Sequence, residues 1–290
     1  MHASVIPALP GWSWEPGIVV PLAATTVLYT LGARAMWLRN VERAGGGRKR
    51  RGIAAWRVAA FGAAIVVLVA ALLSPLDGLS EELFSVHMVQ HELLMAVAAP
   101  ILVLGDPLLV MLWSVPIGAR QAVGRFFRIP VVRRTWHVAS RPFDAWLIHL
   151  VAIWGWHVPF LFQAALRSDA MHALQHVSFL GSGILFWWAI IHPRRRAMLG
   201  MSIIYLFTTA VHTAVLGALM TMSRAPWYPL YGSAAAAWGL TPLADQQLAG
   251  LVMWIPASLS YLVAALLILR RWIRESEWSV ARGERAAAAA

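Results

Sequence analysis

Long apolar runs separated by short polar or basic segments are the dominant pattern of this chain. No run alternates apolar and polar residues with a period of two, so the pattern favours helices over a β-barrel. Each run is close to the roughly 20 residues that a helical membrane span requires. The sequence therefore predicts an all-α polytopic membrane bundle of about seven transmembrane helices. The predicted spans are residues 17–38, 57–74, 84–104, 143–162, 170–191, 198–221 and 246–269.

Basic residues lie almost entirely on one side of the predicted bundle. With the N-terminus outside, 22 of the 24 Lys and Arg residues fall in inner loops or inner helix ends, and only Arg167 and Arg224 face outward. Because cytoplasmic loops carry an excess of Lys and Arg, this split predicts an outer N-terminus and a cytoplasmic C-terminus. We expect one transmembrane domain over residues 1–274 and a cytoplasmic tail over 275–290.

The inner loop at 105–142 is basic with interleaved aromatic residues, as in RQAVGRFFRIPVVRR. This composition predicts an interfacial helix lying on anionic lipid, with a partner-docking site as the alternative. The apolar piece at 108–118 is too short to span the bilayer and is expected to be interfacial or half-inserted.

Composition narrows the chemistry further. Of the 290 residues 60% are hydrophobic, only 13% are charged, and none is cysteine. The net charge of +11 does not indicate nucleic acid, because the arginines occur in short runs between apolar blocks. Without cysteine, a metal ion must be held by His, Met, carboxylate or amide groups. No arrangement typical of a catalytic site stands out, so we do not expect an enzyme.

Histidines concentrate in the predicted outer half of the membrane. The third and fifth spans each begin with two histidines spaced four residues apart, in HMVQH and HALQH. Such residues share one helix face, and two imidazoles so placed can bind one metal ion. A lone histidine in a membrane helix is often a packing residue, but two matching pairs favour a metal or haem site. The six candidate ligands are His87, His91, His172, His176, His157 and His212.

Other polar residues share this level. Gln90 and Gln175 each precede the second histidine of a pair, where they could orient a ligand ring or hydrogen-bond across helices. Asp245 opens the seventh span and is a candidate for the same support or for a helix cap. Glu92 points about 100° away from His91 and is expected to pair with a neighbouring helix. An acidic rim is predicted from Asp77, Glu81, Glu82 and Asp169.

Two further features bear on a site at this level. Methionines such as Met88 offer thioether ligands suited to Cu(I), although we expect most of them to fill the core. The outer loop at 223–244 is long enough to fold over the site as a lid.

An ordered set of motifs resembles the CtaG family of cytochrome c oxidase assembly factors, the seven-span group associated with caa3-type oxidases. The motifs cover roughly residues 75–265 and are HMVQHELLM, WGWHVPFLFQAAL, HALQHVSFLGSGILFWW, HTAVLGALMTMSRAPWYPLY and DQQLAGLVMWIPA. The resemblance implies a bacterial cytoplasmic membrane protein that helps to assemble a haem-copper oxidase, with copper supply as the usual proposal. Its implied partners are oxidase subunits, the lipid bilayer and an external copper donor protein.

Three hypotheses follow from the residues and the resemblance together. The leading one is a copper-binding assembly factor that passes the ion to an oxidase subunit. The second is a haem-binding membrane protein with histidine axial ligands. The third is a copper transporter, for which the predicted inner half offers few polar residues beyond His149.

Overall fold

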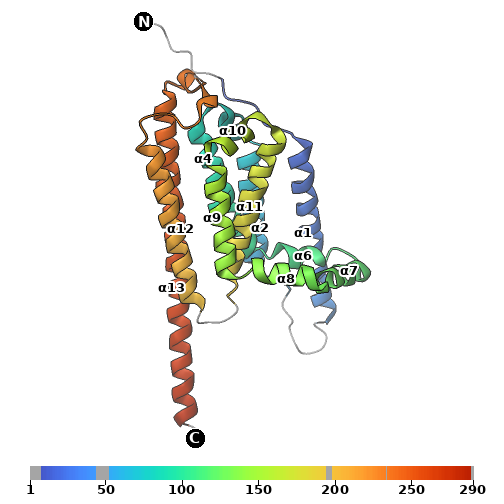
Figure 1. Ribbon diagram of the computed structural model, residues 1–290. Coiled ribbons are helices and arrows are strands. Elements are labelled where there is room, and N and C mark those ends of the chain that lie inside the picture. Colours follow the sequence, from blue (N-terminus) through green and yellow to red (C-terminus); the bar gives the residue numbers. More distant parts are fainter. Residues whose placement is uncertain (1–7, 44–51, 194–197, 233, 289–290) are drawn as a thin grey trace.

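The computed structural model describes residues 8–43, 52–193, 198–232 and 234–288. Its regular structure is entirely helical within those residues, as the apolar pattern predicts. The helices run mostly parallel to one long axis (Figure 1). Their bounds are α1 Pro16–Arg43, α2 Ala55–Leu72, α3 Pro75–Glu82, α4 Phe84–Glu92, the π-helical η2 Leu93–Ala98, α5 Ala99–Leu104, α6 Pro107–Leu112, α7 Ile117–Arg128, α8 Pro130–Ala139, α9 Pro142–Trp156, α10 Pro159–Arg167, α11 Asp169–Ile191, α12 Met198–Thr221, the 3₁₀ turns η3 Pro229–Tyr231 and η4 Ala234–Trp238, and α13 Pro242–Ala288.

Six helical stretches in the described residues are long and apolar enough to cross a membrane, and a bent pair brings the number to seven. The six unbroken stretches begin within four residues of the predicted positions. They are Pro16–Leu38, Ala55–Leu72, Phe84–Leu104, Asp169–Ile191, Leu199–Thr221 and Pro242–Glu277. The prediction of a polytopic helical bundle is therefore confirmed, and α13 continues as helix through most of the predicted tail.

The fourth predicted span, 143–162, is broken. Helix α9 ends at Trp156, and α10 leaves it at an angle of 73°. The cause is local, because Pro159 begins α10 and the preceding Val158 has the extended backbone that a following proline favours. His157 is the residue at the end of α9. Because the helix stops there, the His157 side chain can contact the neighbouring helices.

The third span, which carries His87 and His91, is not one continuous α-helix. It runs through α4, a π-helical segment and α5, and about two thirds of it is buried inside the protein. The π segment follows directly after Glu92, and π-helical turns are rare and often occur at functional sites. The indole of Trp187 donates a hydrogen bond of 2.9 Å to the carbonyl of Met95 inside this segment, which fixes α11 against it.

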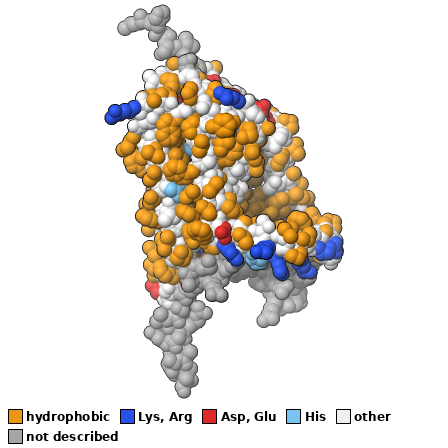
Figure 2. Space-filling view, viewed as in Figure 1, with side chains coloured by type: hydrophobic (Ala, Val, Ile, Leu, Met, Phe, Trp, Pro, Cys, Tyr) orange, Lys and Arg blue, Asp and Glu red, His pale blue; other side chains and the backbone are white. Residues whose placement is uncertain are grey.

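Helices α7 and α8 lie across the bundle at the end opposite α10 (Figure 1). Basic side chains gather at this end, whereas hydrophobic side chains cover the flanks (Figure 2). The segment predicted as one interfacial helix is thus two helices, separated at Ile129 because Pro130 starts a new one. Their placement is that of elements lying flat at a membrane surface.

Candidate metal site

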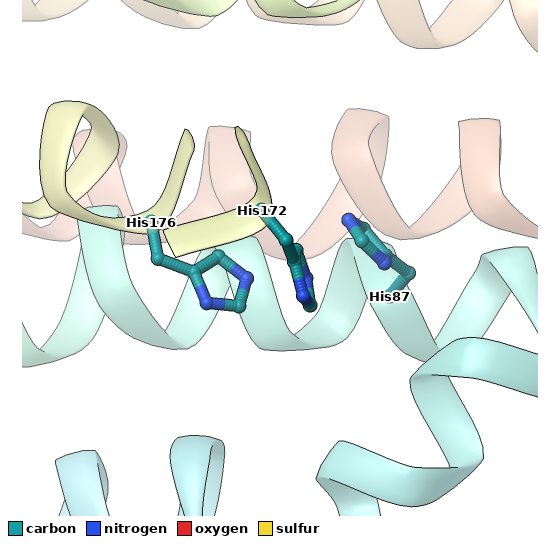
Figure 3. A group of neighbouring side chains, drawn as sticks. All are labelled: His87, His172 and His176. Carbon is teal, nitrogen blue, oxygen red and sulfur yellow. The ribbon is translucent and has the colours of Figure 1, made fainter. Parts of the chain in front are cut away.

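Three histidines from two helices meet at one end of the bundle. His87 comes from α4, and His172 and His176 come from α11. One ring nitrogen of each lies within 4.8 Å of the others. Figure 3 shows the ring of His172 between those of His87 and His176. The ring centroids of His172 and His176 are 4.3 Å apart, and those of His87 and His172 are 5.4 Å apart.

His87 is buried next to the main chain of α3. It is 1% exposed and interacts with the backbone of Ser80, while its Nε2 has no hydrogen-bond partner. Metal-binding histidines usually donate their second ring nitrogen to a carbonyl, a carboxylate or water, and the backbone of Ser80 is the neighbouring group of this kind for His87. The Nε2 atoms of His172 and His176 also have no partner. Each ring of the three-histidine group therefore has an unpartnered nitrogen.

His91 and His157 extend this group toward the bundle interior. His91 is 1% exposed, and neither of its ring nitrogens has a hydrogen-bond partner. Its ring centroid lies 4.3 Å from that of His87, 5.5 Å from that of His176 and 6.3 Å from that of His157. His157 is buried, and its Nδ1 lies 2.6 Å from the carbonyl oxygen of Ile153.

His212 lies apart from these five histidines. Its Nδ1 accepts a bond of 3.4 Å from the indole of Trp154, and its ring packs edge-on against Trp146. It interacts electrostatically with His149 of α9, whose Nδ1 lies 3.0 Å from the hydroxyl of Ser182. The expectation that six histidines converge thus holds for five, because the rotation of α12 directs His212 toward α9.

The two glutamines do not contact a histidine ring through any hydrogen bond among the described residues. Gln90 donates bonds of 2.8 Å to the carbonyl of Ala71 and to the carboxylate of Asp77, so it ties α4 to α2 and α3. Burial raises the pKa of Asp77, and the bond from Gln90 partly offsets this. The side-chain amide of Gln175 is buried without a partner. Of the two roles predicted for these glutamines, Gln90 therefore has the second, a hydrogen bond across helices.

Asp245 caps a helix that is distant in sequence. Its carboxylate, on α13, accepts bonds from the backbone N–H groups of Phe84 at 2.7 Å and Ser85 at 3.1 Å. These amides open α4 and have no partner within that helix, and a negative charge there also suits the helix dipole. Asp245 thus positions the helix that carries His87. Among the described residues its carboxylate makes no hydrogen bond to a histidine ring.

Glu92 is the last residue of α4. It is 8% exposed, and its Oε2 has no hydrogen-bond partner. It interacts electrostatically with Tyr261 of α13. Glu92 therefore interacts with a neighbouring helix, as its angular offset from His91 predicts.

The outer loop covers the site. Tyr228 donates a bond of 2.7 Å to the carbonyl of His157, and Tyr231 donates one of 3.1 Å to the carbonyl of Ser80. Burial raises the pKa of both hydroxyls, so both remain protonated donors. Both rings pack on Phe84 at the start of α4. The loop therefore folds over the histidines, as its length predicts. Sequence reasoning missed these two tyrosines because no periodic pattern marks a loop anchor.

An open cavity of about 360 Å³ leads from the surface to the histidines. His87, His172 and Tyr231 line it. Glu81 and Asp169 of the predicted acidic rim also line it, together with Arg167. Of the other two predicted rim residues, Asp77 accepts the bond from Gln90, and Glu82 accepts one of 2.8 Å from the indole of Trp238.

The match to known proteins agrees with this arrangement. Residues 27–275 match the model of the cytochrome c oxidase caa3 assembly factor family. The chain belongs to this family. The match includes every histidine of the site and all the candidate spans except the beginning of the first and the end of the last.

Curated relatives are longer and carry no described function. An uncharacterized protein of Mycobacterium bovis is 29% identical over 211 residues, which are 70% of this chain and 32% of the relative. One of Mycobacterium leprae is 28% identical over 271 residues, which are 88% of this chain and 40% of the relative. The chain thus spans less than half the length of these relatives. No solved structure is significantly similar to it.

Proposed function

We propose that this protein is a membrane assembly factor for cytochrome c oxidase that binds copper as cargo at His87, His172 and His176 and passes it to an oxidase subunit. The observation that carries the proposal is the convergence of three histidines, each with a ring nitrogen within 4.8 Å of the others and each with an unpartnered Nε2, in a member of an oxidase assembly family. Family membership supports the assembly role, and the donor set supports the cargo.

The donor set suits copper. Neutral imidazole is a common ligand for copper, and the chain has no cysteine to compete. Two nitrogens that each lie about 2 Å from one metal ion are at most about 4 Å apart, so the rings need to approach by about 1 Å or less. The Nε2 of His87 is available to a metal ion, because it has no hydrogen-bond partner.

The cavity supplies an entry route. Carboxylates of Glu81 and Asp169 line it in front of His87 and His172. A cleft lined by negative charge in a low-dielectric setting concentrates cations at its mouth. In the predicted topology the mouth faces outward, where an external copper donor protein is expected to deliver the ion.

The receiving partner is an oxidase subunit in the same bilayer. The family role implies association with the oxidase, and the apolar flanks of the bundle keep the protein within a bacterial membrane. An assembly role needs no catalytic group, which agrees with the absence of a catalytic motif in the sequence.

The decisive experiment is copper loading of the purified full-length protein under anaerobic conditions, followed by metal analysis and competition with a Cu(I) chelator. The His172→Ala/His176→Ala variant should lose affinity by more than the roughly 100-fold that removal of an outer-shell partner costs. The His137→Ala variant is the matched control, because it removes a histidine from α8 at the opposite end of the bundle.

Unchanged copper stoichiometry and affinity in the double variant would overturn the assignment. A Soret band in the purified protein, lost in the same variant, would instead identify the ligand as haem.

A further inference from the structure

A thioether and an imidazole nitrogen face each other deeper in the bundle. The Sδ of Met88 lies 3.4 Å from the Nε2 of His157. Both side chains are almost fully buried, at 0% and 3% exposure. Met88 lies on α4 and His157 at the end of α9, just before the break in the fourth span at Pro159.

This contact has no proton to share. The Nδ1 of His157 lies 2.6 Å from the carbonyl oxygen of Ile153, and because a carbonyl only accepts, Nδ1 must carry the hydrogen. In a neutral ring Nε2 then presents a lone pair, and thioether sulfur is also an acceptor. A charged ring would be costly here, since His157 has no ion pair among the described residues and is shielded from water. The lone pairs of the Met88 sulfur and of the His157 Nε2 therefore face each other.

His91 connects this pair to the three-histidine site. Met88 and His91 are three residues apart on α4 and so lie on neighbouring parts of one face, while His87 and His91 are four apart. The ring centroid of His91 lies 6.3 Å from that of His157 and 5.5 Å from that of His176. Both of its nitrogens lack a partner, although it is 1% exposed. Within about one turn, α4 thus places His87 in the three-histidine site and Met88 beside His157.

We propose that Met88, His157 and His91 form a second binding site, selective for a soft monovalent cation such as Cu(I). Thioether sulfur favours Cu(I) over harder divalent ions, whereas the three-histidine site offers nitrogen alone. His91 lies between the two sites, so Cu(I) moves inward by exchanging one imidazole ligand at a time without changing its oxidation state. The second site rests on the proposed function for its cargo but uses different ligands.

The experiment is X-ray absorption at the copper edge on the full-length protein loaded anaerobically with Cu(I), together with copper stoichiometry. We expect sulfur scattering from the wild-type protein and one copper fewer in Met88→Leu, with the nitrogen-bound copper retained. Met95→Leu is the matched control, because Met95 is a buried methionine on the same span whose substitution should leave both readouts unchanged. Selenomethionine labelling adds a second readout, since wild-type protein should then show copper–selenium scattering that Met88→Leu lacks.

The outcomes separate the two proposals. Nitrogen-only scattering, or the same sulfur signal in Met88→Leu as in the wild type, overturns the second site and leaves the three-histidine site intact. A wild-type protein that binds no Cu(I) overturns both. Loss of sulfur scattering in Met88→Leu and not in Met95→Leu establishes the second site even if the overall yield of the variant falls.

Discussion

Individual side chains show how polar groups in the bilayer are either tied to the main chain or left available. Gln90 and Asp245 bond to backbone or carboxylate groups and hold helices together. The Nε2 atoms of His87, His172 and His176 have no such partner. Because a buried polar atom without a partner is costly, a group of them at one place indicates a ligand.

Removal of the carboxylate in Asp245→Ala should lower the free energy of unfolding by about 2 kcal/mol, since two buried amides at the start of α4 lose their acceptor. Thermal unfolding in detergent measures this, and Asp245→Asn should fall between the variant and the wild type because it keeps one acceptor oxygen. The exposed Asp169 provides the control in Asp169→Ala. A thermal midpoint for Asp245→Ala equal to that of the control would show that the cap contributes little.

Pairs of helices in this protein approach closely where small residues meet. Gly217 on α12 and Gly250 on α13 lie so close that a Cβ at Gly250 would be 2.5 Å from the carbonyl oxygen of Gly217 and 2.4 Å from the hydroxyl oxygen of Thr221. Small residues at such points allow membrane helices to pack backbone to backbone. At this contact the backbones of α12, which carries His212, and α13, which carries Asp245, leave no room for a larger side chain.

A methyl group added by Gly250→Ala should force α12 and α13 apart and lower the free energy of unfolding by about 1–3 kcal/mol. Thermal unfolding of the purified protein measures the change. Gly181→Ala is the matched control, because a Cβ at Gly181 meets no atom within 4 Å and alanine is the better helix former. Equal effects of the two substitutions would contradict the proposed close packing.

The whole molecule is polarised along the membrane normal. The cavity with His87 and His172 is lined by residues of α10, at one end of the bundle, and the basic helices α7 and α8 lie at the other end (Figure 1). Basic segments are retained on the cytoplasmic side, so the histidine end should face outward.

Because the natural sequence has no cysteine, single-cysteine variants can test this orientation directly. In intact cells a membrane-impermeant maleimide should label Arg224→Cys in the outer loop. It should label Arg125→Cys on α7 only after the membrane is permeabilised. Both side chains are exposed in the protein, so accessibility differs only by side of the membrane. The opposite labelling pattern would reverse the topology and place the copper entry on the cytoplasmic side.

The sequence by itself determined the helical bundle, the approximate spans and the depth of the histidine pairs. These features depend on local hydrophobicity and on the helical period, which places His87 with His91 and His172 with His176 on one face each. It also contained the reason for the break at Pro159, although not the angle of 73°.

Only the tertiary structure decided which histidines meet. The helical period fixes directions within one helix, but the rotation between helices depends on contacts such as Gly217 with Gly250, which no single segment contains. That rotation brings His172 and His176 to His87, turns His212 toward Trp154, and places Asp245 beneath the first amides of α4. It also brings Met88 against His157, a contact between residues 69 positions apart in the chain.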